Sequence, residues 1–122
     1  MPTPTPTPTP VPSPIDIRAQ VTNRNVIDTP ELTVSYFNSS DAVIDAVEIL
    51  ICPHNRFGEP LEAYGYSDLC FVGTDNDILA AETLGTGTWT LDGYHTATGA
   101  ELTVLRVHFV DRATWDNGQW VP

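Results

Sequence analysis

Every second residue from Pro2 to Pro14 is a proline, in a run that alternates mainly with threonine. Proline fixes its backbone φ angle and carries no N–H group, so this run can form neither a helix nor a paired strand. The pattern predicts an extended polyproline II segment, roughly 40 Å long at about 3.1 Å per residue. We therefore expect two parts, a Pro/Thr-rich linker or stalk at residues 1–14 and one folded domain at residues 15–122.

Threonines between prolines are typical of O-glycosylated, mucin-like stalks. The candidate acceptors are Thr3, Thr5, Thr7 and Thr9. The linker predicts an extracellular or cell-surface location. The chain carries no signal-peptide pattern and no apolar run of about 18 residues, so we expect no membrane span.

The charge of the chain is strongly negative, with 16 acidic residues against five arginines and no lysine, a formal net charge of −11. An acidic surface disfavours nucleic acid and anionic membranes as partners, because both are polyanions. Two interpretations remain open at this point, namely solubility in an exterior environment and the capture of cations.

Apolar and polar residues alternate through much of residues 15–122, which is the pattern of half-buried strands. The pattern predicts strands at 15–21, 32–37, 43–54, 61–66, 100–110 and 113–115, and one around Trp89 and Leu91. Residues 67–77 are predicted to be mostly loop, residues 78–84 to be either an edge strand or one helical turn, and Gly85 and Gly87 to break that segment. These elements predict an all-β fold, an antiparallel β-sandwich of about seven strands, with a closed barrel as the alternative.

The alternation also predicts which side chains share a face. One predicted face carries Ile15, Ile17, Ala19 and Val21, a second Val47, Ile49 and Ile51, and a third Thr103, Leu105, Val107 and Phe109, opposite Val104, Arg106 and His108.

Two sequence signals predict turns. Asn117-Gly118 is typical of a type I′ hairpin and would set Trp115 opposite Trp120; a turn at Asp111-Arg112 is an alternative, or a second turn in series. Asn38-Ser39-Ser40 matches an N-glycosylation acceptor, although such matches arise often by chance, and we interpret it as the turn after the second strand.

Cys52 and Cys70 are the two cysteines of the chain. In an oxidising compartment we expect them to form a disulfide worth roughly 3 kcal/mol in the chain-entropy model. The alternative is a pair of small buried hydrophobic side chains.

Residues that carry chemistry are few. No nucleophile elbow, phosphate loop or zinc motif is present, so we expect no enzyme and no required cofactor. Asp75 and Asp77 are candidate Ca²⁺ ligands, with an Asx-rich turn as the alternative. Tyr64, Tyr66 and Trp120 are candidates for a sugar-stacking platform.

Three segments together resemble small immunoglobulin-like domains of bacterial secreted and cell-surface proteins: DAVEILICPHNRFGEPL at 45–61, LGTGTW at 84–89 and VLRVHFVDRATW at 104–115. The shared features are a long strand ending in a hairpin, a glycine turn before a tryptophan strand, and a final hairpin before a second tryptophan. The resemblance implies an immunoglobulin-like β-sandwich and a non-enzymatic module, and it implies no catalytic or ligand-binding residues.

The expected function is that of a structural or adhesion module, a spacer, in an extracellular protein. Its partners would be other domains of that protein or copies of itself. Two alternatives stay open. One is a carbohydrate-binding module that binds glycans, and the other is a subunit of an extracellular filament joined through the N-terminal Pro-Thr segment.

Overall fold

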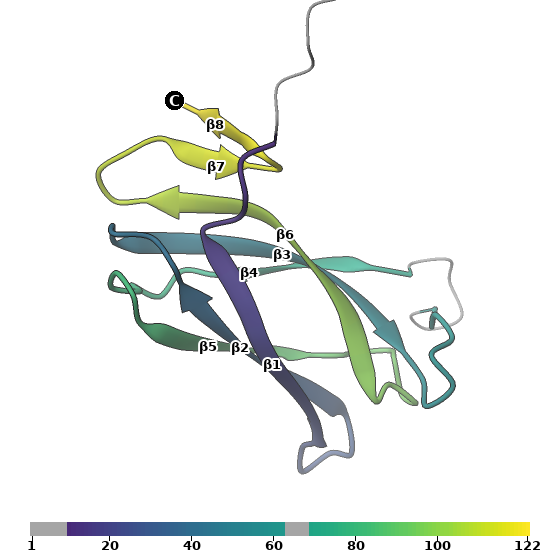
Figure 1. The fold of residues 1–122 in the computed structure, drawn as a ribbon. Coiled ribbons are helices and arrows are strands. Elements are labelled where there is room, and N and C mark those ends of the chain that lie inside the picture. The colour runs from purple at the N-terminus through teal and green to yellow at the C-terminus, as the bar shows by residue number, and fades with distance from the viewer. Residues whose placement is uncertain (1–9, 63–68) are drawn as a thin grey trace, which may run out of the picture.

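The computed structural model describes residues 10–62 and 69–122, which form eight strands and no helix (Figure 1). The strands are β1 (Ile15–Arg24), β2 (Pro30–Asn38), β3 (Ile44–His54), β4 (Phe71–Asp75), β5 (Leu84–Thr90), β6 (Gly99–Phe109), β7 (Thr114–Asp116) and β8 (Gln119–Val121). They form a three-stranded sheet in the order β1-β2-β5 and a five-stranded sheet in the order β4-β3-β6-β7-β8. Every pairing is antiparallel. The predicted all-β class is confirmed, and the arrangement is consistent with a β-sandwich.

The core lies between the inner faces of the two sheets. Strand β2 alternates without interruption and buries Leu32, Val34 and Tyr36. Strand β3 buries Val47, Ile49 and Ile51 on the predicted face, while Glu48 and Leu50 on the other face are half-buried. For Leu32–Tyr36 and Val47–Ile51 the period-2 pattern gives the correct orientation, because no residue of either segment is skipped in its pairing.

Bulges overturn the predicted faces of two other strands. The register of β1 against β2 skips Arg18, so Ala19 and Val21 point to solvent, and Val21 is 54% exposed. The register of β6 against β3 skips Leu105, which turns Val104 toward the core in place of Leu105. A bulge adds one residue to one strand and reverses the alternation beyond it.

The predictions for residues 67–90 were wrong in two respects. Phe71–Asp75 is a strand, and Gly85 and Gly87 lie inside β5. Packing requires glycine at position 87 of β5 and at position 73 of β4, since a Cβ atom on Gly87 would lie 2.6 Å from the indole of Trp89 and one on Gly73 would lie 2.8 Å from it. Gly73 and Gly87 therefore leave the space that Trp89 fills.

Residues 78–83 form neither of the two predicted elements. Leu79 makes an isolated bridge to Ile44, and β5 begins at Leu84. In the predicted return strand at 61–66, Leu61 and Glu62 are not in a strand, while the remainder lies outside the described residues.

The C-terminal hairpin follows the prediction. Asn117 and Gly118 have φ angles of 46° and 93°, as a type I′ turn requires, and Trp115 pairs with Trp120. A bend at Asp111-Arg112 precedes β7, so the two turns occur in series. Trp115 is 5% exposed and Trp120 is 47% exposed.

A disulfide joins Cys52 near the end of β3 to Cys70 just before β4, with 4.2 Å between the two Cα atoms. It clips together two adjacent strands of the five-stranded sheet at the end where the chain leaves β3.

The described part of the Pro-rich segment packs on the body. The Val11 N–H donates to the Gly118 carbonyl at 2.8 Å, and the indole Nε1 of Trp115 donates to the Val11 carbonyl at 2.9 Å. Ser39 donates its backbone N–H to the Pro14 carbonyl at 2.9 Å. The candidate acceptors Thr3, Thr5, Thr7 and Thr9 lie outside the described residues. Among the described residues, no helix is long and apolar enough to cross a membrane.

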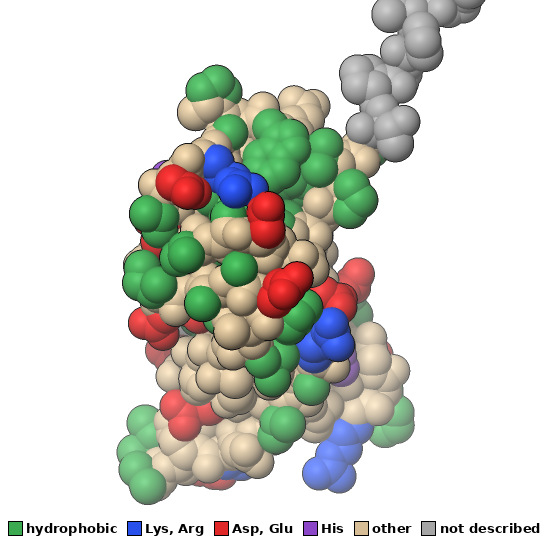
Figure 2. All heavy atoms as spheres, turned by 60° about the vertical axis from the view of Figure 1, so that its left-hand side comes forward, with side chains coloured by type: hydrophobic (Ala, Val, Ile, Leu, Met, Phe, Trp, Pro, Cys, Tyr) green, Lys and Arg blue, Asp and Glu red, His purple; other side chains and the backbone are tan. Residues whose placement is uncertain are grey.

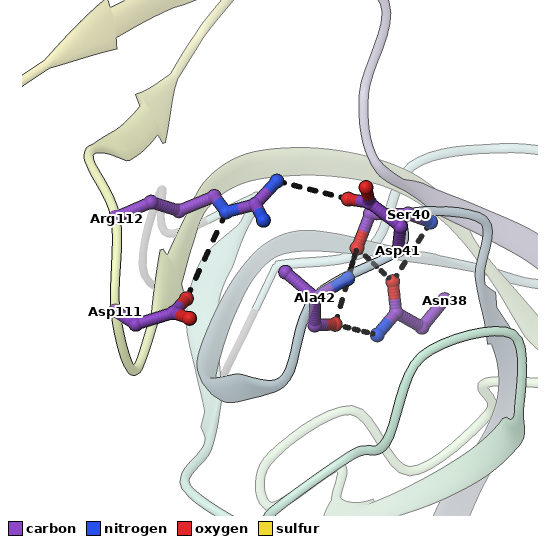
Figure 3. A network of polar contacts seen from close by, with 6 residues as sticks. All are labelled: Asn38, Ser40, Asp41, Ala42, Asp111 and Arg112. Carbon is purple, nitrogen blue, oxygen red and sulfur yellow. Dashed lines mark hydrogen bonds and ion pairs between the residues drawn. The ribbon is translucent and has the colours of Figure 1, made fainter.

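Asn38 is a fully buried polar side chain at the end of β2 (Figure 3). Its amide nitrogen lies 2.9 Å from the Ala42 carbonyl, 3.3 Å from that of Leu79 and 3.0 Å from that of Ala80, and its oxygen accepts from the N–H and hydroxyl of Ser40. Asn38 therefore joins the turn after β2 to the segment before β5. A side chain with these bonds has no room for a glycan, in agreement with the turn interpretation.

Outside this buried centre, charged side chains join the same turn to the connection between β6 and β7 (Figure 3). Arg112 donates to the carboxylate of Asp41 at 3.0 Å and lies 3.7 Å from that of Asp111. These pairs are exposed, so they contribute little compared with Asn38.

We predict that Asn38→Asp lowers the free energy of unfolding by about 3 kcal/mol, because a carboxylate oxygen would face three carbonyl oxygens in a buried site. Guanidinium denaturation followed by tryptophan fluorescence measures the loss.

Asn25→Asp is the matched control. Asn25 uses only its side-chain oxygen, which accepts from the N–H groups of Ile27 and Thr29, so a carboxylate can replace it. We expect a change below about 1 kcal/mol there. Equal losses in the two variants would contradict the role given to the Asn38 amide.

Candidate functional site

The molecule has two distinct ends. At one, which we call the tethered end, residues 10–14 meet the hairpin of β7 and β8, and the C-terminus lies nearby (Figure 1). At the other, the distal end, lie the connections 25–29, 55–59 and 94–98. The first of these connections is the β1–β2 turn at the bottom of Figure 1. Because residues 10–14 pack at the tethered end, they leave the distal end open to solvent.

A hollow of about 400 Å³ opens at the distal end. We call it the distal hollow, and its lining residues come from the end of β1 and from the connections 55–59 and 94–98: Arg24, Asn55, Arg56, Phe57, Thr96 and Thr98. Figure 2 shows arginine and hydrophobic side chains reaching the surface at the lower end of the molecule. The exposed hydrophobic side chains of this region include Val26 at 103%, Ile27 at 77% and Phe57 at 88% exposure.

Arg24 holds two of the distal connections together. It is the last residue of β1, and its guanidinium donates through Nη1 to the Asp28 carbonyl at 2.9 Å and through Nη2 to the His95 carbonyl at 2.6 Å. The Asp28 carboxylate is also 3.6 Å from Nη1, in an exposed contact. The guanidinium of Arg24 therefore lines the hollow with a positive charge, and the two backbone carbonyls fix its orientation.

The third connection is held by Asn55. Its side-chain oxygen accepts from the N–H groups of Phe57 at 2.9 Å and Glu59 at 3.1 Å, and its backbone N–H and carbonyl bond to Glu59 and Gly58. Gly58 has a φ of 77°, which closes the turn. The loop is thus internally hydrogen-bonded, and it presents Arg56 and Phe57 side by side to solvent.

Arg56 differs from the other four arginines. Arg18, Arg24, Arg106 and Arg112 each have a carboxylate within 4 Å, whereas Arg56 makes no ion pair or hydrogen bond with any described residue. An unpaired guanidinium is unexpected in a chain with 16 acidic residues. Its five donors are therefore available to a ligand.

A second hollow of about 290 Å³, which we call the sheet hollow, lies on the outer face of the five-stranded sheet. It is lined by Ala46, Glu48, Thr74, Asn76, Arg106, His108 and Thr114. Arg106 donates its Nε to Glu48 at 2.9 Å, and this bond lowers the pKa of the Glu48 carboxyl from its usual value. His108 Nδ1 lies 2.5 Å from the Asp45 carboxylate.

The sheet hollow contains an acid–histidine pair without a bonded nucleophile. Neither Thr74 nor Thr114 hydrogen-bonds to His108 among the described residues, so no nucleophile–base pair is assembled. Its charges also neutralise one another across β3 and β6. The distal hollow, with an unpaired cation, is the better candidate for ligand binding.

The two candidate calcium ligands face different surroundings. Asp75 is 8% exposed and accepts a hydrogen bond from the Tyr36 hydroxyl, while its other oxygen accepts the Asp77 N–H at 3.0 Å. This is the Asx turn given above as the alternative. No group of three His, Cys, Asp or Glu side chains within residues 10–62 and 69–122 is arranged to hold a metal ion.

The candidate aromatic platform cannot be assembled from the described residues. Tyr64 and Tyr66 lie outside them. Trp120 lies on β8 at the tethered end, with its ring 5.8 Å from that of Phe109. Trp120 is thus separated from the distal hollow by the length of the sandwich.

Sequence reasoning did not single out the distal hollow. Its residues come from three places in the sequence between Arg24 and Thr98, and no spacing rule joins them. One signal was present, since Arg56-Phe57-Gly58 places a cation and an aromatic residue at the tip of a predicted hairpin turn.

Comparison with known proteins gives a fold relationship only. No protein-family model matches the chain, and no curated protein matches it. Its structure is similar to the crystal structure of a hypothetical protein from Peptoclostridium difficile 630, with a TM-score of 0.69 over 90% of this chain and 94% of that chain. The two sequences are 14% identical, so the likeness concerns the arrangement of strands.

The Tyr36–Asp75 bond predicts a pH dependence. Burial, and then the bond to Asp75, raises the pKa of Tyr36 above its usual value of 10.0. The stability that this proton provides is complete below about pH 10 and is lost at higher pH, as the raised pKa is approached. We predict that Tyr36→Phe lowers the free energy of unfolding at pH 7 by about 1–3 kcal/mol, because Asp75 loses its donor. The variant should then lose less stability than the wild type between pH 7 and pH 11.

Guanidinium denaturation at the two pH values tests this. Thr33→Val is the control, because it removes an exposed hydroxyl from the same strand and should cost less than about 0.5 kcal/mol. Parallel pH curves for wild type and Tyr36→Phe would refute the assignment.

Proposed function

We propose that this chain is a non-enzymatic extracellular adhesion module, an immunoglobulin-like domain carried on a Pro-Thr stalk in a bacterial surface or secreted protein. The stalk attaches at the tethered end, and the distal end meets the target. Other domains of the same protein would be joined at the tethered end.

One observation carries this proposal, which is that the distal hollow opens at the end opposite the stalk. Residues 10–14 and the C-terminal hairpin bond to each other through Val11 and Gly118. A domain strung in line between two others would have its entry and exit at opposite ends. Here the chain enters and leaves the domain at the same end. The opposite end is then free to contact a target, which favours an adhesion module over a passive spacer.

Further support comes from the local structure of the tip. The loop at 55–59 is fixed by hydrogen bonds of Asn55, and Phe57 is 88% exposed at its apex. An aromatic side chain held in solvent by a rigid turn contributes nothing to the core, and exposed aromatic residues are enriched in binding surfaces.

The non-enzymatic part of the proposal is supported by the chemistry of the sheet hollow. Its His108 has a carboxylate partner in Asp45 but no hydrogen-bonded hydroxyl or thiol among the described residues. Such a pair stabilises the strands β3 and β6 without providing a nucleophile.

The carbohydrate-binding alternative is favoured by Trp120, which is 47% exposed on an edge strand. The filament alternative is favoured by the bonds of Val11 to the C-terminal hairpin, because the same segment of a neighbouring copy would fit the same bonds. The first alternative predicts binding that depends on Trp120. The second predicts polymers that disappear when residues 2–14 are deleted.

The adhesion proposal predicts retention on a target surface that depends on the distal end. Microspheres carrying the full chain are exposed to a panel of mucin, extracellular matrix and immobilised neutral and acidic glycans. We expect retention on at least one surface, reduced about tenfold or more by Phe57→Ser, because Phe57 is the most exposed aromatic side chain of the tip.

Trp120→Ala is the matched control, since it removes an exposed aromatic side chain at the other end. Retention on none of the surfaces would refute the adhesion proposal. Retention that is lost with Trp120→Ala and kept with Phe57→Ser would favour the carbohydrate-binding alternative at the tethered end.

A further inference from the structure

We infer that the distal hollow binds a sugar that bears a single carboxylate, of the uronic or sialic acid type. This inference rests on the proposed function, because it names the ligand class of the same distal end. It is argued from the charge, the lining groups and the rigidity of the hollow.

The charge of the hollow selects an anion. Arg56 has no acidic partner among the described residues, and the second arginine of the lining, Arg24, has its guanidinium directed by two backbone carbonyls. A guanidinium binds a carboxylate through two parallel hydrogen bonds, which gives both strength and direction. Two acidic side chains of the distal connections, Asp28 and Glu59, are engaged with Arg24 at 3.6 Å and with the Asn55 amide at 3.2 Å.

The net charge of the chain limits how many negative charges the ligand carries. At −11 the protein repels polyanions such as nucleic acid or a run of acidic residues. A ligand with one carboxylate on an otherwise neutral framework gains the contact with Arg56 and meets the least repulsion.

The other lining groups match a sugar. Thr96 and Thr98 are exposed hydroxyl residues on the 94–98 connection, and no described residue accepts or donates a hydrogen bond to either hydroxyl. Hydroxyls donate and accept, as sugar hydroxyls do. The exposed ring of Phe57 provides an apolar surface beside Arg56 on which the C–H face of a pyranose can pack.

The rigidity of the hollow reduces the cost of binding. Arg24 is fixed by two carbonyls, the 55–59 loop by Asn55, and the 94–98 connection by the bond from Thr98 N–H to the His54 carbonyl at 3.0 Å. Loops that are already ordered lose little conformational entropy when a ligand binds.

The test uses the full chain and four defined probes. Sialyllactose and cellobiouronic acid each carry one carboxylate, and lactose and cellobiose are their neutral counterparts. Titration calorimetry gives the affinity, and the NMR signals of the arginine Nε–H groups report which guanidinium is contacted. We expect both acidic probes, or one of them, to bind at least about tenfold more tightly than the neutral counterpart and to shift the Arg56 signal.

Arg56→Gln should weaken binding about 10- to 100-fold, because a charged hydrogen bond is lost. It should not affect folding, since the side chain contacts no described partner. Arg18→Gln is the matched control. It removes the same charge from β1, where Arg18 pairs with Asp16 at 2.8 Å outside the hollow, and should change affinity less than about threefold.

Several results would overturn the inference: no binding of either acidic probe, equal binding of the neutral sugars, equal losses in the two arginine variants, or tighter binding of a hexaglutamate peptide. The proposed function fails separately. If Phe57-dependent retention on a surface persists while neither acidic probe binds, adhesion stands and the ligand class is wrong. If no surface retains the full chain, adhesion itself fails.

Discussion

The apolar interior between the two sheets is the constraint on which the rest of the structure depends. At its centre, β2 buries Leu32, Val34 and Tyr36 from one sheet, and β3 buries Val47, Ile49 and Ile51 from the other. Trp89 then fills the space between the sheets over Gly73 and Gly87. Once this interior is formed, the position of each outer strand is set by register, and the loops at both ends acquire fixed positions.

Two buried polar groups add specificity to this apolar interior. Asn38 bonds to carbonyls of the turn after β2 and of the segment before β5, and Asp75 on β4 accepts from Tyr36 on β2. Each group joins elements distant in sequence, and each would be costly to bury unpaired. A one-residue slip of β2 would leave both without partners, so they favour a single register over alternatives that bury similar apolar area.

The sequence was sufficient for the class of fold, for the orientation of β2 and β3 and for the C-terminal hairpin, because these depend on local alternation and on the backbone preferences of Asn117 and Gly118. It was insufficient where contacts between residues distant in the sequence determine the local structure. Arg18 and Leu105 are ordinary strand residues, and nothing local marks them as bulges. Gly85 and Gly87 were interpreted as breakers because the local sequence does not show what they pack against, which is Leu79 for Gly85 and Trp89 for Gly87. The distal hollow was missed for the same reason, since it exists only after the end of β1 and two connections meet.

The position of the unpaired arginine links the fold to its function. In a chain of net charge −11, a random arrangement would surround every guanidinium with carboxylates, and four of the five arginines have such partners. In the turn that carries Arg56, Asn55 engages the carboxylate of Glu59, and the exposed Arg56 makes no ion pair with any described residue. The negative charge of the body repels polyanions. The unpaired guanidinium at the tip can still be reached by a small, singly charged ligand.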